Sequence, residues 1–307
     1  MPKVIVISVT IAALTAAIGF FFKIEDWTAP VEVPAGVLAG RGVAVSANNL
    51  SLMIVFAFPL MWHWFIYSSR AFSKQMALIL MILNFIGLVS TFSRSGFLLF
   101  NITLFMLIFQ YRHKFFTIRY LGVILSVFFI VIVVVILFIP KSYIERQKSL
   151  LLGTRADTSI ERRADYIPVA LDAFKKHPLI GTGMYTFRII WTKSERAQKL
   201  RIEEREAHNT YLDVLVGTGI IGLTLFFALI LQCIKNFSQA IKVFESMNDE
   251  ETASIIKAYR ISFIAILIDF LTYSVIEHNF FVIGIALSAF AVKMAEEAKI
   301  INNSMLT

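Results

Sequence analysis

Residues 211–234 read YLDVLVGTGIIGLTLFFALILQCI, with one formally charged side chain, Asp213, near the start. A helix crosses the hydrocarbon core of a bilayer with about 20 mostly apolar residues, because each residue adds 1.5 Å. This run satisfies that length, so it predicts a transmembrane helix. The fold class then depends on how often similar runs recur in the chain.

The rest of the chain has the composition of a membrane protein. Hydrophobic residues make up 58% of the sequence and charged residues 16%, and the mean hydropathy is +0.74, outside the range of soluble globular domains. About eight candidate spans satisfy the length requirement: Val4–Phe22, Asn48–Tyr67, Gln75–Phe92, Gly96–Tyr111, Arg119–Ile139, Tyr211–Ile234, Arg260–Val275 and Phe280–Met294. The first lacks an A-x-A-type cleavage site, which favours a span over a signal peptide. The sequence therefore predicts an all-α, polytopic transmembrane helical bundle.

One long polar segment, Lys141–His208, interrupts the apolar pattern. It holds fourteen of the 29 Lys and Arg residues and nine of the 21 Asp and Glu residues. Every second short connection is also basic, as at Arg70 and Lys74, and the positive-inside rule makes these connections cytoplasmic. The polar segment then lies on the extracytoplasmic side, because long segments translocate largely regardless of charge. Topology thus explains the net charge of +8, and no nucleic-acid partner is expected.

This pattern predicts three regions. Residues 1–139 form about five N-terminal transmembrane helices, residues 140–209 an extracytoplasmic catalytic loop, and residues 210–307 about three C-terminal transmembrane helices. The single cysteine, Cys233, excludes an intramolecular disulfide and a cysteine-based metal cluster.

The polar segment itself contains predicted helices. Thr158–Glu161 has the pattern of a capping box and opens a helix that His177–Pro178 closes. Apolar residues recur within it at helical spacing: Ile160, Ala164, Ile167, Leu171 and Phe174. Lys193–Glu206 is expected to be a charge-rich helix. The spacing after it places His208 on one face of the next helix, together with Tyr211, Leu212 and Leu215.

Gly217–Gly222 matches the dinucleotide-binding fingerprint G-x-G-x-x-G letter for letter. That fingerprint requires a preceding strand and an acidic residue about 20 positions later, whereas this match lies within a predicted span. We therefore interpret its glycines as allowing close helix packing or a bend.

Several ionisable side chains are candidates for function. Arg94 lies at the turn of a helical hairpin, where a guanidinium either snorkels to the interface or binds an anion such as phosphate. Asp269 is expected in mid-span, where it is either functional or hydrogen-bonded to a neighbouring Ser or Thr. His278, beside Glu277, is expected on the same outer face as His208, as a second-choice base or a lid residue.

Four sequence elements together resemble the O-antigen ligase and O-antigen polymerase family. They follow the family's order: Ser46–Leu50, similar to its asparagine at the start of a span; Ser93–Gly96, similar to its SRxg hairpin turn; Arg162, Tyr166 and Pro178–Gly183, similar to its R…W…hPlxGxG segment; and His208–Leu212 with Gly217–Gly222, similar to its HNxyL…xxGxxG element. Tyr166 stands where the family usually has tryptophan.

The resemblance implies a metal-independent glycosyltransferase that needs no cofactor. It would move a glycan from undecaprenyl diphosphate to an acceptor glycan or glycolipid, outside the bacterial cytoplasmic membrane, and invert the anomeric centre. By position, Arg94 and Arg162 would bind the lipid diphosphate, and His208 would activate the acceptor hydroxyl. Secondary candidates are Arg163, Tyr166, Asn209, Tyr211, Asp269, Glu277 and His278.

Two other classes of function stay open. A transporter or flippase for a lipid-linked sugar predicts charged or broken mid-membrane helices and an inverted repeat, with Asp269 as its support. An inactive scaffold would bind polyprenyl diphosphate without turnover. Among transferases, polymerase and ligase differ only in the acceptor. The sequence has no readable acceptor code, and we favour a polymerase or a general surface-glycan role.

Overall fold

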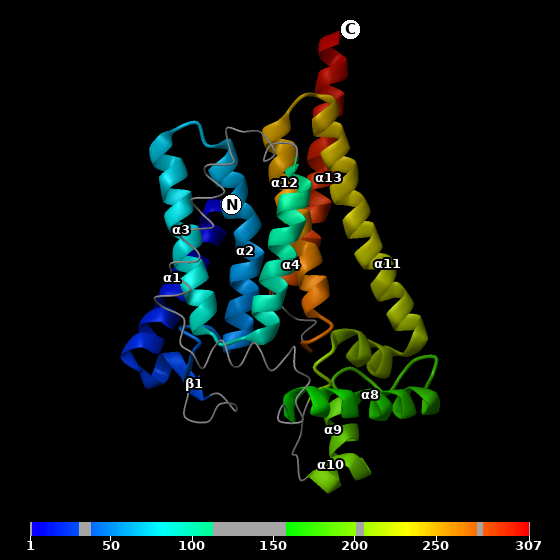
Figure 1. Cartoon of the computed structure of the whole chain (residues 1–307). Coiled ribbons are helices and arrows are strands. Elements are labelled where there is room, and N and C mark those ends of the chain that lie inside the picture. Colours follow the sequence, from blue (N-terminus) through cyan, green and yellow to red (C-terminus); the bar gives the residue numbers. More distant parts are fainter. Residues whose placement is uncertain (1, 31–37, 113–157, 201–205, 275–278, 307) are drawn as a thin grey trace. The chain divides into compact units, whose positions relative to one another are not determined.

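The computed structural model describes residues 2–30, 38–112, 158–200, 206–274 and 279–306 (Figure 1). The chain divides into two compact units, Met1–Thr154 and Arg155–Thr307. Helices dominate the described part of both units, and several are long and apolar enough to cross a membrane. These helices confirm the predicted all-α, polytopic membrane fold. A described helix stands at every predicted span except Arg119–Ile139, which lies outside the described residues.

Unit 1 is a bundle of helices with one small hairpin. Its described elements are α1 (Pro2–Phe22), a 3-10 turn (Glu25–Trp27), β1 (Thr28–Pro30), β2 (Leu38–Gly40), α2 (Ala47–Tyr67), α3 (Ala71–Ser90) and α4 (Arg94–Gln110). Helices α1, α2 and α3 have the length and composition of membrane spans, while α4 is shorter at 17 residues. Helix α2 packs against the other three. The antiparallel β1–β2 pair was not predicted from the sequence.

Small side chains let α1 and α3 approach closely. One face of α1 buries Ala12, Ala13, Ala16 and Ala17. A Cβ added at Gly87 of α3 would lie 2.6 Å from the Cβ of Ala13, which is closer than real side chains come. The buried amide of Asn84 donates a 2.7 Å hydrogen bond to Thr10 Oγ1 on α1. Close packing of small residues with an interhelical hydrogen bond is typical of membrane helix association.

Unit 2 combines a helical bundle with shorter helices. Its described elements are α8 (Thr158–Lys176), α9 (Phe187–Thr192), α10 (Glu195–Leu200), α11 (Thr210–Ser246), α12 (Glu250–Asp269) and α13 (Asn279–Leu306). Helices α11, α12 and α13 pack against one another, and α8 packs on α9 and α11. Aromatic rings fill the bundle: Phe281 lies 5.0 Å from Phe270 and 5.7 Å from Phe263, between ring centroids.

The helices of the polar segment agree only partly with the predictions. Helix α8 begins at Thr158 and ends before His177–Pro178, as predicted. The predicted helix at Lys193–Glu206 is wrong at its described ends, because α10 begins at Glu195 and Glu206 is not helical; residues 201–205 lie outside the described part. Helix α9 was not predicted. Its buried Phe187 and Trp191, four residues apart, are the signal that could have revealed it.

Candidate functional site

In unit 1, two of the recognised motifs meet through one serine. Ser93 caps the N-terminus of α4, because its Oγ accepts a 3.1 Å hydrogen bond from the amide of Gly96. The same hydroxyl donates a 2.8 Å hydrogen bond to Asn48 Oδ1 in the first turn of α2. A Cβ at Gly96 would lie 2.3 Å from Ser51 of α2. The hairpin turn and the asparagine segment therefore form one packed structure.

Arg94 is the first residue of α4, directly after this capping serine. Its side chain is half-buried. The turn before it is fixed by Phe92, which is 1% exposed, has φ of 52° and contacts the ring of Phe20. The prediction that Arg94 occupies the turn of a helical hairpin is confirmed, because α3 ends at Ser90 and α4 starts here.

In unit 2, a buried aromatic cluster joins the short helices to α11. The ring of Tyr166 on α8 meets Trp191 edge to face at 4.6 Å and Phe187 at 6.1 Å. Val169, Ala170 and Ala173 of α8, with Ala197, Ala207 and Val216, complete the cluster. The apolar residues of α8 thus lie on two faces: Tyr166 is buried, whereas the predicted stripe residues Ile167 and Leu171 are exposed.

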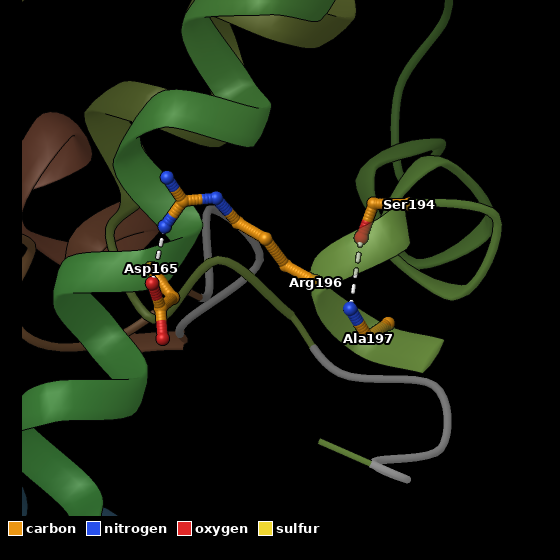
Figure 2. A network of polar contacts seen from close by, with 4 residues as sticks. All are labelled: Asp165, Ser194, Arg196 and Ala197. Atoms are coloured by element: carbon orange, nitrogen blue, oxygen red, sulfur yellow. Dashed lines mark hydrogen bonds and ion pairs between the residues drawn. The ribbon is translucent and has the colours of Figure 1, made fainter. Parts of the chain in front are cut away.

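Polar contacts hold α10 against α8 beside this cluster. Arg196 of α10 forms an ion pair with Asp165, the neighbour of Tyr166 on α8 (Figure 2). Ser194 caps α10, because its Oγ accepts a 3.2 Å hydrogen bond from the amide of Ala197 (Figure 2). Its hydroxyl also donates to the carbonyl of Trp191 at 2.6 Å. A half-exposed ion pair contributes about 0–1 kcal/mol, so it mainly fixes the orientation of α10.

His208 lies beside Tyr166, with 6.0 Å between the ring centroids and a tilt of 33°. The predicted placement of His208 on a helical face is wrong. Asn209 is the N-cap of α11, since its Oδ1 accepts a 3.1 Å hydrogen bond from the amide of Leu212. His208 therefore precedes the helix, in the left-handed region at φ of 48°. Such a backbone is uncommon outside glycine, although His, Asn and Asp adopt it more readily.

The start of α11 is tied to the end of α12. The amide of Asn209 donates a 2.8 Å hydrogen bond to Ser274 Oγ. The amide of Thr210 donates to the carbonyl of Phe270 at 2.8 Å, and its hydroxyl donates to the carbonyl of Tyr273 at 2.7 Å. The hydroxyl of Ser274 also lies close to the carboxylate of Asp213. Neither Ser274 nor Asp213 was a predicted site residue, although Asp213 could have been found as the one charged residue of the apolar run 211–234.

Tyr211, another secondary candidate, binds α12 in the same region. Its hydroxyl donates a 2.8 Å hydrogen bond to the carbonyl of Leu267, and its ring stacks on Phe227 at 5.5 Å. These contacts give Tyr211 a structural role in joining α11 to α12.

The two glycine motifs pack directly on each other. Helix α11 is kinked at Gly219, where φ is 66° and ψ is −165°. Across the kink, the amides of Thr182 and Gly183 donate to the carbonyls of Val216 and Gly217 at 2.8 and 2.9 Å. A Cβ at Gly219 would lie 2.3 Å from the carbonyl oxygen of Leu179, and one at Gly181 would lie 2.5 Å from the backbone of Gly217. The interpretation of these glycines as a bend with close packing is confirmed.

Asp269 does not lie in mid-span as predicted. It is the last residue of α12 and is 8% exposed. Thr272 donates a 3.4 Å hydrogen bond to its Oδ1, so the alternative of a bond to a neighbouring Thr holds. Arg163 of α8 lies close enough for its charge to act on this carboxylate. Glu277 and His278 lie outside the described residues.

The predicted site residues fall in both units. Arg94 belongs to unit 1, and Arg162, Tyr166 and His208 belong to unit 2. Position 162 lies one turn of α8 before Tyr166, so unit 2 places the backbone of that arginine on the helix that contacts His208. Within the described ranges, no three His, Cys, Asp or Glu side chains gather closely enough to hold a metal ion.

An imidazole beside an arginine-bearing helix can serve a reaction in which a hydroxyl is deprotonated and an anion departs. Imidazole accepts protons near neutral pH, and guanidinium groups bind phosphate oxygens in a bidentate way.

Residues 76–227, from α3 past the kink of α11, match the family model described as O-antigen ligase. No curated protein matches the chain. The family match confirms the resemblance that the motifs indicated.

Proposed function

Residues 76–227 of this chain match the O-antigen ligase family, and we propose that the chain is a multi-pass membrane enzyme that transfers a glycan from an undecaprenyl-diphosphate-linked donor. The acceptor is a hydroxyl of a second glycan or glycolipid. The reaction takes place on the extracytoplasmic face of a bacterial cytoplasmic membrane. No nucleotide is required there, because the donor already carries its leaving group.

His208 is the proposed general base. The acceptor oxygen forms a bond to the anomeric carbon of the donor while the bond from that carbon to the diphosphate oxygen breaks. The acceptor proton passes to the imidazole, and the leaving diphosphate keeps the electron pair. A single displacement of this kind inverts the anomeric centre. General base catalysis contributes about 10²–10⁴-fold to such a rate.

Arg94 and Arg162 are the proposed diphosphate-binding residues. Negative charge increases on the diphosphate as it departs, and fixed guanidiniums at a partly desolvated position stabilise that charge. The half-buried Arg94 at the first turn of α4 suits this role, because the N-terminus of a helix also favours an anion. Arg163, which acts on Asp269, is better explained as a residue that orients α8.

The observation that carries the proposal is the contact between Tyr166 and His208. It brings the candidate base to the helix that carries Arg162, although His208 lies 42 residues after Tyr166 in the chain. The left-handed backbone of His208 adds support, because backbone strain of this kind clusters at functional sites.

The test replaces His208 by Asn, which accepts a left-handed backbone but cannot serve as a base. We expect His208→Asn to remain folded in the membrane and to lose transfer of a lipid-linked glycan by about 10²-fold or more. The matched control is His177→Asn, at the exposed end of α8, which should keep wild-type transfer. Equal glycan profiles for both variants would remove His208 from the mechanism.

A second pair of variants tests the diphosphate role. Arg94→Lys keeps the charge but loses the planar fork. Undecaprenyl diphosphate should therefore inhibit transfer from the lipid-linked donor more weakly in this variant, which should still fold. The exposed Arg112 supplies the control Arg112→Lys. If wild-type protein binds undecaprenyl diphosphate but transfers nothing to any acceptor, the scaffold function replaces the transferase.

A further inference from the structure

Two adjacent aliphatic side chains project from the turn that follows α8. Leu179 is 62% exposed and Ile180 is 77% exposed, and we call this pair the apolar tip. They lie between Pro178 and Gly181, where the chain reverses after α8. Adjacent aliphatic residues this exposed are unfavourable in water, because apolar surface is stabilised by leaving it.

The turn is attached to α11 at the kink. The amide of Ile220 donates a 2.9 Å hydrogen bond to the carbonyl of Pro178, and the amide of Ile221 donates to that of Leu179 at 3.3 Å. The backbone that carries the apolar tip therefore lies directly against the residue at which α11 continues as a long apolar helix.

An exposed apolar stripe of α11 starts at this same point. Ile221, Leu225 and Leu229 are 51%, 66% and 41% exposed, and their spacing of four places them on one helical face. Helix α11 is long and apolar enough to cross a bilayer. In a helix that spans a membrane, such a stripe faces lipid acyl chains. The apolar tip is hydrogen-bonded to Ile221, so it continues the lipid-facing surface.

Several backbone groups of the turn are paired within the protein, which lowers the cost of entering lipid. Polar backbone groups in the hydrocarbon region must find partners within the protein. The carbonyls of Pro178 and Leu179 are bonded to α11, and the amide of Gly181 donates to the carbonyl of His177 at 3.1 Å. The next two amides are bonded across the kink at 2.8 and 2.9 Å. In a fully solvated loop, water could bond these backbone groups instead.

We propose that the apolar tip inserts into the acyl-chain region of the bilayer beside α11. Insertion would fix the C-terminal end of α8 at the level of the lipid headgroups. The occupant of this surface is lipid. The inference needs only the membrane fold, so it stands or falls separately from the proposed transfer reaction.

The test uses environment-sensitive fluorophores on single cysteines. Because Cys233 is the one native cysteine, a Cys233→Ala background accepts Ile180→Cys and Leu179→Cys. The matched control is Gln198→Cys on the exposed side of α10. Each full-length variant is labelled with an NBD group and reconstituted in phosphatidylglycerol–phosphatidylethanolamine vesicles. Size-exclusion profiles check that the labelled proteins are folded.

We expect NBD at positions 179 and 180 to be quenched at least twofold more by acyl-chain nitroxide lipids than by aqueous iodide. The control at position 198 should show the opposite order. Iodide quenching of positions 179 and 180 equal to that at 198 would overturn the proposal. Protection of both positions from both quenchers would also overturn it, because a protein surface and not lipid would then cover the tip.

Discussion

The imidazole of His208 and the phenol ring of Tyr166 lie 6.0 Å apart between ring centroids, in planes tilted by 33°. Tyr166 is itself 2% exposed and fixed by Trp191 and Phe187. One side of the His208 ring therefore faces a rigid, buried surface. This support and the N-cap at Asn209 hold the residue on both sides of its strained backbone.

Removing the ring of Tyr166 should destabilise unit 2 and displace His208. Truncation of a large buried aromatic side chain costs about 3–5 kcal/mol, so Tyr166→Ala should lower the melting temperature of the detergent-solubilised protein and abolish transfer. Tyr166→Phe keeps the packing and should change stability by less than about 1.5 kcal/mol. The control on the same helix is Ile167→Ala, at a side chain 46% exposed. Similar melting temperatures for Tyr166→Ala and Ile167→Ala would contradict the packing role.

Gly219 should tolerate no side chain. Ala at this position combines a left-handed φ with a Cβ 2.3 Å from the carbonyl oxygen of Leu179. With ψ of −165°, this backbone is essentially restricted to glycine and costs another residue about 1–3 kcal/mol, and the clash adds to it. We expect Gly219→Ala to reduce folded protein in the membrane, as judged by monodisperse yield. Thr224→Ala, at an exposed position of α11, should have no such effect, and equal yields for the two would argue against the kink.

The hydrogen bond between Ser93 and Asn48 should show as a coupling energy. Ser93→Ala removes both the cap of α4 and the 2.8 Å bond to Asn48, and loss of a cap alone costs about 1 kcal/mol. A double-mutant cycle with Asn48→Ala should give about 0.5–1.5 kcal/mol of coupling, measured by thermal unfolding. The comparison pair is Ser93→Ala with Ser46→Ala, the cap of α2. A coupling no larger than in that pair would contradict the predicted link.

Ser274 should act as a positioning residue for His208. Its hydroxyl accepts a hydrogen bond from the amide of Asn209, so Ser274→Ala leaves a part-buried amide without its acceptor. Loss of such a partner costs about 1–3 kcal/mol. We expect a lower kcat for transfer with KM for the donor unchanged. Ser274→Thr, which restores the hydroxyl, should recover kcat. Failure of the Thr variant to recover it, with normal folding, would assign Ser274 a packing role only.

The membrane fold was readable from the sequence because span length and hydropathy are local properties. The hairpin turn at Ser93–Gly96 and the bend at Gly217–Gly222 were also interpreted correctly, since the turn separates two apolar runs and the bend follows from glycine content. The β1–β2 hairpin was not, because strands of three residues are too short to show a period-2 pattern.

Tertiary contacts decided the remaining features. The exposed stripe of Ile167 and Leu171 has the stronger helical periodicity, yet the buried face of α8 contains Tyr166 and three small or branched residues. His208 was placed on α11 because its spacing to Tyr211 and Leu212 fits a helix. Asn209 is instead the N-cap at which α11 begins. The geometry of this cap depends on Ser274, 65 residues later.

The groups that anchor Asn209 and Thr210 come from Phe270, Tyr273 and Ser274, all beyond residue 227, where the family match ends. During translation, the histidine motif thus leaves the ribosome well before the residues that hold it in place. A chain that ended at residue 227 would carry these motifs but lack the three anchors that hold Asn209 and Thr210. The residues just after α12 therefore complete the support of the histidine motif.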